Sequence, residues 1–363
     1  MNLLHYIIII VFLLLIIIIY YNINYNLFIL DIRKKSNNII LSNQSLGLVN
    51  DCKILQYYIN LQCNIKYHII NIFTLSAYFS QYVQYIFVKI NKFNSIIVVE
   101  SPPIYLNKDM CDNIILVPNS DFLDINKISI YSTILTKNYY TYNLLIPYHM
   151  NVKYIGFTSM IQKHNNSLQI KNKKYFIHMA GKSPYKGTIR LIQFWRDNIK
   201  YMKKHDYYLI IILRHILILN TTELIHSKYM VSIEKDNIYY YKTREECHIN
   251  IFDCMFHICT SENEGFGHYI NEAKSAGCIV ITLDNPPMNE IITNDFGFLI
   301  KNNMIKRYNK LVDRYIFNKD ELFGIFKKIE SIDDNMLNNM SIKALESFYL
   351  NHNIFLDKIN ALF

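Results

Sequence analysis

Two glutamates and two glycines stand close together in the segment CTSENEGFGHYINEAKSAG, which begins at residue 259. Glu264 is separated from Glu272 by seven residues, and Gly265 and Gly267 lie just after Glu264. Glycines let the backbone approach a ligand closely, and they expose amide N–H groups beside the positive start of a helix. The pattern therefore predicts a loop suited to holding a diphosphate.

The two carboxylates of this segment have the chemistry to bind hydroxyl groups. With a strand before the loop and a helix after it, Glu264 lies in the loop and Glu272 in the first turns of the helix. Both can then point into the crevice at the carboxyl ends of parallel strands, where open α/β sheets bind ligands. A carboxylate there can accept two hydrogen bonds from adjacent hydroxyls of a sugar or a ribose. Compensation of the helix dipole would explain Glu272 alone, but its spacing from the glycine loop favours binding.

A second run, MAGKSPYKG, supplies positive charge. It places Lys182 and Lys186 four residues apart, between Gly181 and Gly187, at the expected junction of a strand and a helix. Two cations flanked by glycines suit a pyrophosphate. The Gly-Lys-Ser triplet could suggest the phosphate loop of a nucleotide triphosphatase, but that loop needs a glycine where this chain has Phe176. In so lysine-rich a chain, surface charge is the alternative explanation for the two lysines.

The elements that must position these residues alternate between strand and helix, which favours an α/β fold with parallel sheets. In the first half we expect strands at Asn38–Ser42, Ile65–Ile72, Ile96–Val99, Ile114–Val117 and Lys153–Phe157, a loop with Gly47 at Asn43–Asp51, and a helix at Asp51–Leu61. In the second half we expect strands at Tyr175–Met179, Tyr207–Leu213, Ile238–Tyr241, His257–Thr260 and Ile279–Leu283, and helices at Thr188–Ile199, at His268–Ala276 and from Lys319 onward.

A chain of 363 residues exceeds the usual size of one domain, so two domains sharing a cleft are expected. The polar stretch Gln162–Lys174, rich in Asn and Lys, is the expected connection between them. We therefore predict a first domain over residues 27–165, a linker over 166–174, a second domain over 175–340, and C-terminal helices over 341–363.

Charge and cysteine content exclude some classes of protein. The net charge is +9, from 38 Lys and Arg against 29 Asp and Glu, but no basic stripe with interleaved aromatic residues stands out. A nucleic-acid partner is therefore not expected. The seven cysteines are odd in number and form no CxxC pair, so they indicate neither a disulfide framework nor a zinc ribbon. Buried thiols in a reducing compartment fit them better.

The first 26 residues contain an unbroken apolar run from Tyr6 to Tyr21, close to the ~20 residues that cross a bilayer. The basic start and small-residue cleavage site of a signal peptide are missing, so an uncleaved membrane anchor is favoured. Arg33, Lys34 and Lys35 follow the run, and none precedes it, which places the bulk of the protein in the cytosol. The alternative, a lumenal side, is indicated only by Asn-x-Ser/Thr sequons, which arise by chance in an Asn-rich chain.

The segment EGFGHYINEA, the later PPMNE at Pro286–Glu290 and the loop AGKSPYKGT resemble family-four glycosyltransferases, also described as glycosyl transferases group 1. That family has the GT-B fold, in which two Rossmann-like domains face each other. The resemblance on the donor side covers about Tyr175–Ile300. Weaker similarity extends through Val117–Phe122, Leu135–Lys137 and Tyr154–Ser159.

The resemblance implies transfer of a sugar from a nucleoside-diphosphate sugar with retention of configuration. Glu264 would contact hydroxyls of the sugar, Glu272 would hold the ribose, and Lys182 and Lys186 would stabilise the diphosphate as leaving group. The rest of the donor site would be lined by Gly181, Gly265, Phe266 and Gly267. Since lysines and helix ends supply the positive field, no metal ion and no cofactor beyond the donor substrate are expected.

The acceptor is open between a carbohydrate, a lipid and a protein, and His68 and His149 are the candidates for an acceptor-side histidine. A membrane-anchored glycosyltransferase is the favoured function. A sugar-nucleotide-binding or scaffold protein that keeps the donor half without catalysis is the alternative, because the glycine loop after the first strand is reduced to Gly47. An epimerase or phosphorylase of the same fold fits less well, since an epimerase of this fold needs no anchor and no lysine stands out as the Schiff-base partner of a cofactor.

Overall fold

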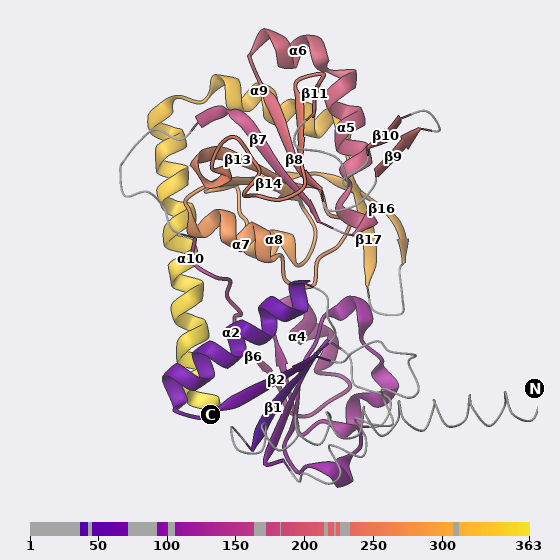
Figure 1. Ribbon diagram of the computed structural model, residues 1–363, viewed down its shortest axis with the longest axis vertical. Coiled ribbons are helices and arrows are strands. Elements are labelled where there is room, and N and C mark those ends of the chain that lie inside the picture. The colour runs from indigo at the N-terminus through magenta and orange to yellow at the C-terminus, as the bar shows by residue number, and fades with distance from the viewer. Residues whose placement is uncertain are drawn as a thin grey trace, which may run out of the picture. The chain divides into compact units, whose positions relative to one another are not determined.

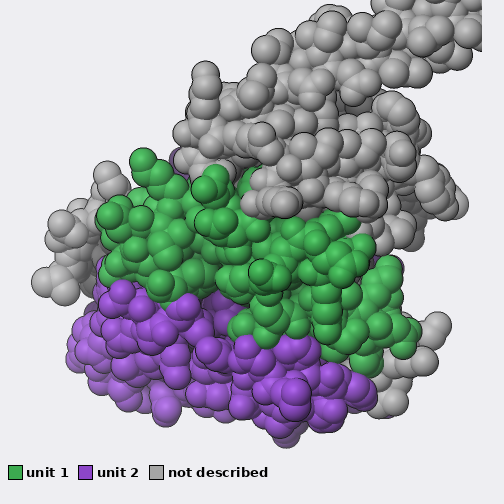
Figure 2. All heavy atoms as spheres, turned by 90° about the horizontal axis from the view of Figure 1, so that it is seen from below, with its two compact units in different colours: residues 1–117, 124–134, 363 green, residues 118–123, 135–362 purple. Residues whose placement is uncertain are grey.

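The computed structural model describes residues 37–42, 46–71, 93–100, 106–162, 172–181, 183–213, 217–220, 223–225, 233–307 and 312–363 (Figure 1). These residues form two compact units (Figure 2). The first unit comprises the described residues up to 117 together with 124–134 and 363, and the second comprises 118–123 and 135–362. Both loops that carry the predicted chemistry belong to the second unit.

Short runs of isoleucine, leucine and valine form a first sheet of six strands, in the order β2-β1-β3-β4-β5-β6. Neighbouring strands from β2 to β5 are parallel. The elements of this part are β1 (Asn38–Ser42), α2 (Leu46–Cys63), β2 (Tyr67–Asn71), β3 (Ser95–Val99), β4 (Ile114–Val117), β5 (Thr133–Thr136), α4 (Tyr139–Leu145) and β6 (Val152–Tyr154). Every residue of β3 and β4 is buried, as expected for parallel strands covered on both faces.

Helix α2 begins earlier than predicted. The loop expected at Asn43–Asp51 is wrong from Leu46 onward, and Gly47 lies in the first turn of the helix. The reason is the burial pattern, because Leu48, Cys52 and Leu55 repeat at helical spacing and are all buried. Packing of that face outweighs the modest cost of a glycine in a helix.

A second sheet of seven strands has the order β11-β12-β8-β7-β13-β14-β15 and is parallel except for its edge pair β11–β12. Its strands are β7 (Asn172–Gly181), β8 (Tyr208–Leu213), β11 (Ile233–Lys235), β12 (Ile238–Tyr241), β13 (Cys254–Cys259), β14 (Ile279–Leu283) and β15 (Gly297–Ile300). The helices that follow them include α5 (Thr188–Asp197), α6 (Ile199–Lys204), α7 (His268–Ser275) and α8 (Met288–Ile291), with α7 against β13 and β14 (Figure 1). The predicted α/β fold with parallel sheets is confirmed.

Aromatic side chains fill the core of this second sheet. The ring of Phe176 on β7 stacks on Phe256 of β13, with centroids 5.0 Å apart, and it also contacts Trp195 and Phe326. All four side chains are fully buried. Phe176 is the residue at which a phosphate loop would require glycine, so its place in the core excludes that loop.

The limits of several predicted elements agree with the structure, and others shift. Strands Asn38–Ser42, Ile114–Val117, Ile238–Tyr241 and Ile279–Leu283 have the predicted bounds. Strand β7 starts at Asn172, inside the stretch predicted as a linker, and the predicted helix Thr188–Ile199 is two helices that meet at Asn198. At the C-terminus, α9 (Lys319–Ser331) is followed by α10 (Asp334–Leu362), a single helix that begins before residue 341.

Two small antiparallel pairs were not predicted. One pairs β9 (Leu217–Asn220) with β10 (Glu223–Ile225), and the other pairs β16 (Asn302–Arg307) with β17 (Asp313–Phe317). The strand β17 is tied to the site described below, because the backbone N–H of Tyr315 donates to the carbonyl of Glu262 at 3.0 Å.

The predicted membrane anchor at residues 1–26 lies outside the described residues. Among the residues that the structure describes, no helix combines the length and the apolar character needed to cross a bilayer.

Candidate active site

The loop after β13 turns into α7 at a glycine with a left-handed backbone. Gly267 has a φ of 81° and stands at the N-cap of α7, where its carbonyl accepts the N–H of Asn271 at 3.1 Å. Residues with a side chain are strained in this conformation, so the turn requires glycine. The helix therefore starts at His268, as predicted, and carries Glu272 in its second turn.

The loop after β7 approaches the loop after β13 at a second glycine. Gly187 has a φ of 67°, and a Cβ atom added there would stand 2.2 Å from the carbonyl oxygen of Thr260. No side chain fits in that space. The need for glycine at position 187 is thus explained by the close contact between two loops, which follow the carboxyl ends of the neighbouring strands β7 and β13.

Two hydrogen bonds join these loops. The hydroxyl of Thr260 donates to the carbonyl of Lys186 at 2.9 Å, and the backbone N–H of Glu262 donates to the carbonyl of Tyr185 at 2.8 Å. The guanidinium of Arg314 from β17 covers the ring of Tyr185 at 3.4 Å from its centroid. The backbone around Lys186 is therefore fixed relative to the loop that carries Glu264.

Lys186 and Glu264 form an ion pair across the two loops. Their side chains are 21% and 12% exposed, and Glu264 also accepts the hydroxyl of Ser261 at 2.5 Å. Burial opposes the charged ammonium of Lys186, but the neighbouring carboxylate more than offsets this, so the pKa of Lys186 lies above its usual value. The structure thus brings together a lysine and a carboxylate that the sequence predicted separately, with the lysine fully protonated at neutral pH.

Two buried groups beneath this pair were not predicted. His178 on β7 contacts the carbonyl of Ile258 at 2.9 Å through Nδ1 and the hydroxyl of Thr188 at 2.8 Å through Nε2. Burial lowers its pKa to about 4, so the ring is neutral and joins β7, β13 and the start of α5. The thiol of Cys259 lies 3.9 Å from Glu264, and burial, together with that carboxylate, raises its pKa to about 11. Both groups therefore support the site without carrying charge.

Glu272 is buried and forms an ion pair with Arg244. Arg244 comes from the loop after β12, and its guanidinium also lies 5.6 Å from the centroid of the Phe252 ring. Glu272 stands beyond the first turn of α7, so compensation of the helix dipole does not account for it. The sequence did not indicate Arg244, because an arginine in an irregular loop carries no pattern.

The remaining predicted residues are placed as follows. Gly181 ends β7 with a φ of 60°, and Lys182 lies outside the described residues. The ring of Phe266 is buried against Phe157, with centroids 5.1 Å apart, so only the backbone of Phe266 can contact a ligand.

Of the two candidates for an acceptor-side histidine, His149 accepts the backbone N–H of Asn151 through Nδ1 at 3.1 Å. The side chain of His68 lies outside the described part.

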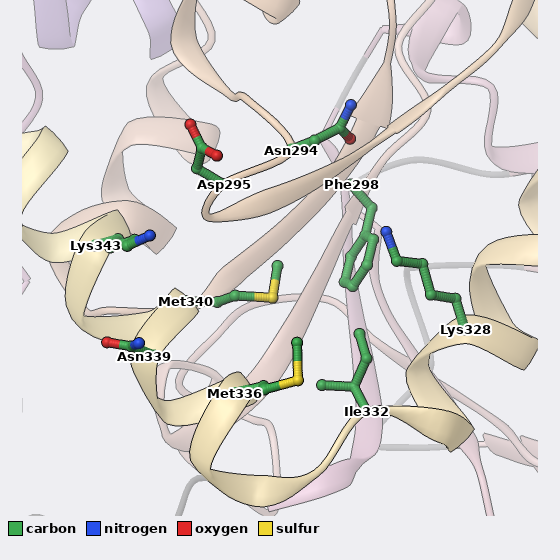
Figure 3. A pocket seen from close by; sticks show the side chains of 9 residues that line it. All are labelled: Asn294, Asp295, Phe298, Lys328, Ile332, Met336, Asn339, Met340 and Lys343. Carbon is green, nitrogen blue, oxygen red and sulfur yellow. The ribbon is translucent and has the colours of Figure 1, made fainter.

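A pocket of about 290 Å³ lies elsewhere in the second unit (Figure 3). Its lining includes Phe298, Met336 and Met340 together with Lys328 and Lys343, and it contains none of the predicted site residues. The pocket lies beside the start of β15, whereas the two loops follow the ends of β7 and β13. Within the described residues, no group of three His, Cys, Asp or Glu side chains is placed to hold a metal ion.

Several solved structures of glycosyltransferases share the fold of this chain. The glycosyltransferase from Rickettsia africae ESF-5 is 13% identical, with a TM-score of 0.57 over 89% of this chain and 96% of that one. HepE from Anabaena, in complex with UDP and glucose, is 12% identical, with a TM-score of 0.55 over 90% and 97%. The match to the GtfA/B complex, at 11% identity and a TM-score of 0.51, covers 78% of this chain but only 61% of that chain. The fold is the GT-B fold of glycosyltransferases.

Residues 160–328 match the family model for glycosyl transferases group 1. This stretch contains both loops, the Lys186–Glu264 pair and Glu272. It therefore belongs to that family, as its motif predicted, and the chain carries a glycosyltransferase domain. A comparison with curated protein sequences found no significant match.

Proposed function

We propose that the protein transfers a sugar from a nucleoside-diphosphate sugar to an acceptor, with retention of configuration and without a metal ion. The observation that carries the proposal is the partly buried Lys186–Glu264 pair, held across two loops at the carboxyl ends of neighbouring strands. Ligands of open α/β sheets bind at these strand ends. A cation and a carboxylate placed side by side there match a diphosphate joined to a polyhydroxylated sugar.

The chemical role of each group follows from its charge. When the bond between the anomeric carbon and the diphosphate oxygen breaks, negative charge grows on the leaving phosphate. The ammonium of Lys186 and the N–H groups at the start of α7 stabilise that charge without reorganising. Glu264 accepts hydrogen bonds from hydroxyls of the sugar and Glu272 from the ribose, while Lys182 adds a second cation and Gly181, Gly265 and Gly267 keep the backbone close to the ligand. The new bond forms from an acceptor hydroxyl on the same face of the sugar, and the hydroxyl proton passes to the leaving phosphate oxygen.

The donor is proposed to carry uridine diphosphate. HepE from Anabaena was solved with UDP and glucose, and the pneumococcal O-GlcNAc transferase GtfA, 14% identical over 77% of this chain, with UDP and GlcNAc. We extend that chemistry to the present chain because its two loops and carboxylates lie within the matched family domain. The acceptor is a carbohydrate, a lipid or a protein, and a nucleic acid is not proposed.

A sugar-nucleotide-binding protein without transfer activity is the second candidate. It is favoured by one observation, that Gly47 lies in the first turn of α2 rather than in a glycine loop after β1. In that case the donor would bind through the same two loops but would not be turned over.

We further propose that residues 1–26 anchor the protein in a membrane, with the bulk of the chain in the cytosol. The support is the apolar run at Tyr6–Tyr21 followed by Arg33, Lys34 and Lys35. Alkaline carbonate extraction of cells that express the full chain tests this directly. Retention in the membrane pellet is expected, and release into the supernatant would refute the anchor.

The activity is tested by screening a panel of nucleoside-diphosphate sugars, beginning with UDP-glucose and UDP-N-acetylglucosamine, for binding and for slow hydrolysis. The full chain in detergent is compared with the variants Glu264→Ala and Lys186→Ala. Turnover of one donor, lost in both variants, is the expected result. Binding without turnover would favour the second candidate, and a folded protein that binds no donor would contradict both.

A further inference from the structure

The start of helix α4 contacts both parts of the donor motif. The side-chain amide of Asn138 donates to the carbonyl of Gly265 at 2.9 Å. The backbone N–H of the next residue, Tyr139, donates to the carboxylate of Glu290 at 2.8 Å. Gly265 belongs to the segment EGFG, and Glu290, 25 positions later, ends the segment PPMNE, so one short stretch of chain holds both segments.

Asn138 is fixed at both ends of its side chain. Its oxygen caps α4 by accepting the N–H of Thr141 at 2.8 Å, and its nitrogen makes the bond to Gly265. The residue is 4% exposed. Because each end has a partner of the opposite kind, the amide can take only one orientation, and its nitrogen must face the loop.

The bond from Asn138 sets the direction of a backbone donor. In a trans peptide the C=O of Gly265 and the N–H of Phe266 point in opposite directions within one plane. Holding the carbonyl towards Asn138 therefore turns the N–H of Phe266 to the other side of the loop. The ring of Phe266, buried against Phe157, keeps the same residue from rotating.

Neighbouring side chains also hold the loop at Gly265 in this position. The side-chain oxygen of Asn119 would stand 2.5 Å from a Cβ added at Gly265, so only glycine allows this approach. Asn119 is in turn held by the ammonium of Lys137 at 2.6 Å, and Lys137 is 3% exposed. A further bond joins Asn263 to Asp121. All of these residues belong to the second unit.

From these contacts we propose that Asn138 is a positioning residue of the donor site, which aims the N–H of Phe266 at the transferred sugar of the donor. The inference rests on the proposed function and adds to it a segment outside the matched family domain. Asn119 and Lys137 support the same loop from the side of Gly265. Asn119, Lys137 and Asn138 all lie outside the Glu-x7-Glu motif and the lysine loop.

The variant Asn138→Asp isolates the contact with Gly265. A carboxylate in this place still accepts the N–H of Thr141 and suits the start of a helix, so α4 keeps its cap. The donor to Gly265 is lost, and the carboxylate repels the carbonyl. Asn143→Asp is the matched control, because Asn143 is exposed on the same helix and undergoes the same change of charge.

We expect Asn138→Asp to lower kcat for UDP-glucose, or for the donor that the screen identifies, by about tenfold or more, because the lost hydrogen bond is joined by repulsion between the new carboxylate and the carbonyl of Gly265. The melting temperature and the affinity for UDP should stay close to those of Asn143→Asp. Equal kcat in the two variants would overturn the proposal. A loss of activity that is matched by an equal loss of melting temperature and of UDP affinity would also overturn it, in favour of a general role in folding.

Hydrogen exchange separates this proposal from the proposed function. If the wild-type chain turns over no donor, the proposed function fails, but the exchange rate of the backbone amides at 263–268 still reports on the loop. Faster exchange in Asn138→Asp than in Asn143→Asp, at unchanged melting temperature, would support the positioning role. Identical exchange would refute it.

Discussion

Glu264 and Glu272 belong to the same motif, but the chain holds them in different ways. Glu264 lies in a loop, and its position depends on contacts between that loop and the loop that carries Lys186. Glu272 lies on a helix, and only its partner, Arg244, comes from a loop. The position of Glu264 therefore depends on the contacts between the two loops, whereas the position of Glu272 is set by the regular geometry of α7.

This difference assigns different tasks to the two residues. Groups that stabilise a transition state must be held within a fraction of an ångström, and such precision needs supporting contacts. The loops around Glu264 have these contacts, from Thr260, Ser261 and His178. A carboxylate that only holds a ribose tolerates more freedom, and Glu272 has fewer supports. We therefore expect changes at Glu264 to affect turnover and changes at Glu272 to affect binding.

The largest effect is expected for Glu264→Gln, which keeps the shape of the side chain but removes its charge. Turnover should fall by about 10²–10³-fold, the usual cost of losing one electrostatic contact in a transition state. Steady-state kinetics with the identified donor measures it, and UDP affinity should change little, because UDP lacks the sugar. A loss of UDP affinity as large as the loss of turnover would remove the distinction between the two carboxylates.

Acid should weaken the Glu264 side of the site through His178. Its pKa is about 4 in the folded protein, where the ring is buried, against an ordinary value of 6.5. The unfolded chain therefore binds a proton first, so the contribution of His178 to stability is complete above pH 6.5 and is lost as the pH falls towards 4. The loss is on the order of 3 kcal/mol.

Urea unfolding at several pH values between 4 and 7 measures this loss. The variant His178→Gln should show a flatter dependence on pH over the same interval. If the wild type and the variant lose stability in parallel, His178 is not the group that titrates.

Glu272→Gln should weaken UDP binding by about tenfold, the effect of weakening one hydrogen bond to a charged group. The value of kcat at saturating donor should remain within a few-fold of wild type, because α7 still places the side chain. Calorimetric titration with UDP and steady-state kinetics together measure both quantities. A large fall in kcat with unchanged UDP affinity would reverse the roles assigned to Glu264 and Glu272.

The smallest effect is expected for Thr260→Val, which removes the hydroxyl that holds the carbonyl of Lys186 but keeps the shape of the side chain. One hydrogen bond contributes about 1 kcal/mol, so turnover should fall by roughly fivefold while UDP affinity stays the same. Thr282→Val is the control, because the buried hydroxyl of Thr282 has no hydrogen-bond partner among the described residues. If Thr282→Val lowers turnover as much as Thr260→Val, the tie between the loops is irrelevant.

The local parts of the site could be predicted from the sequence. Glycines at positions 187, 265 and 267 stand where the backbone turns or where two segments of the chain touch. Because the chain has only nine glycines, these positions stand out in the sequence. The start of α7 and the strand before it followed from the same residues. The lysine loop and the carboxylate loop were recognised separately, because each is a short motif.

Contacts between distant segments could not be predicted. Arg244 lies in an irregular loop, and Asn138 and Asn119 are two among many asparagines, so neither periodicity nor spacing marks them. The paired strands β16 and β17 and the early start of α2 were also missed, because packing against the rest of the fold, rather than a local pattern, determines where these elements form. His178 gave one usable signal, a polar residue within the apolar strand YFIHMAG, and such a residue is buried only when it has partners.

The pairing of Lys186 with Glu264 as one donor site is the central claim, and titration with UDP in parallel with turnover tests it most directly. Lys186→Met should weaken UDP binding by about tenfold or more, because the diphosphate loses a cation. Glu264→Gln should bind UDP at least as well as the wild type, because its lysine is then released to the phosphates, and yet its turnover should fall by about 10²–10³-fold. If Lys186→Met binds UDP as tightly as the wild type, the pair is structural and the site described here does not bind the donor.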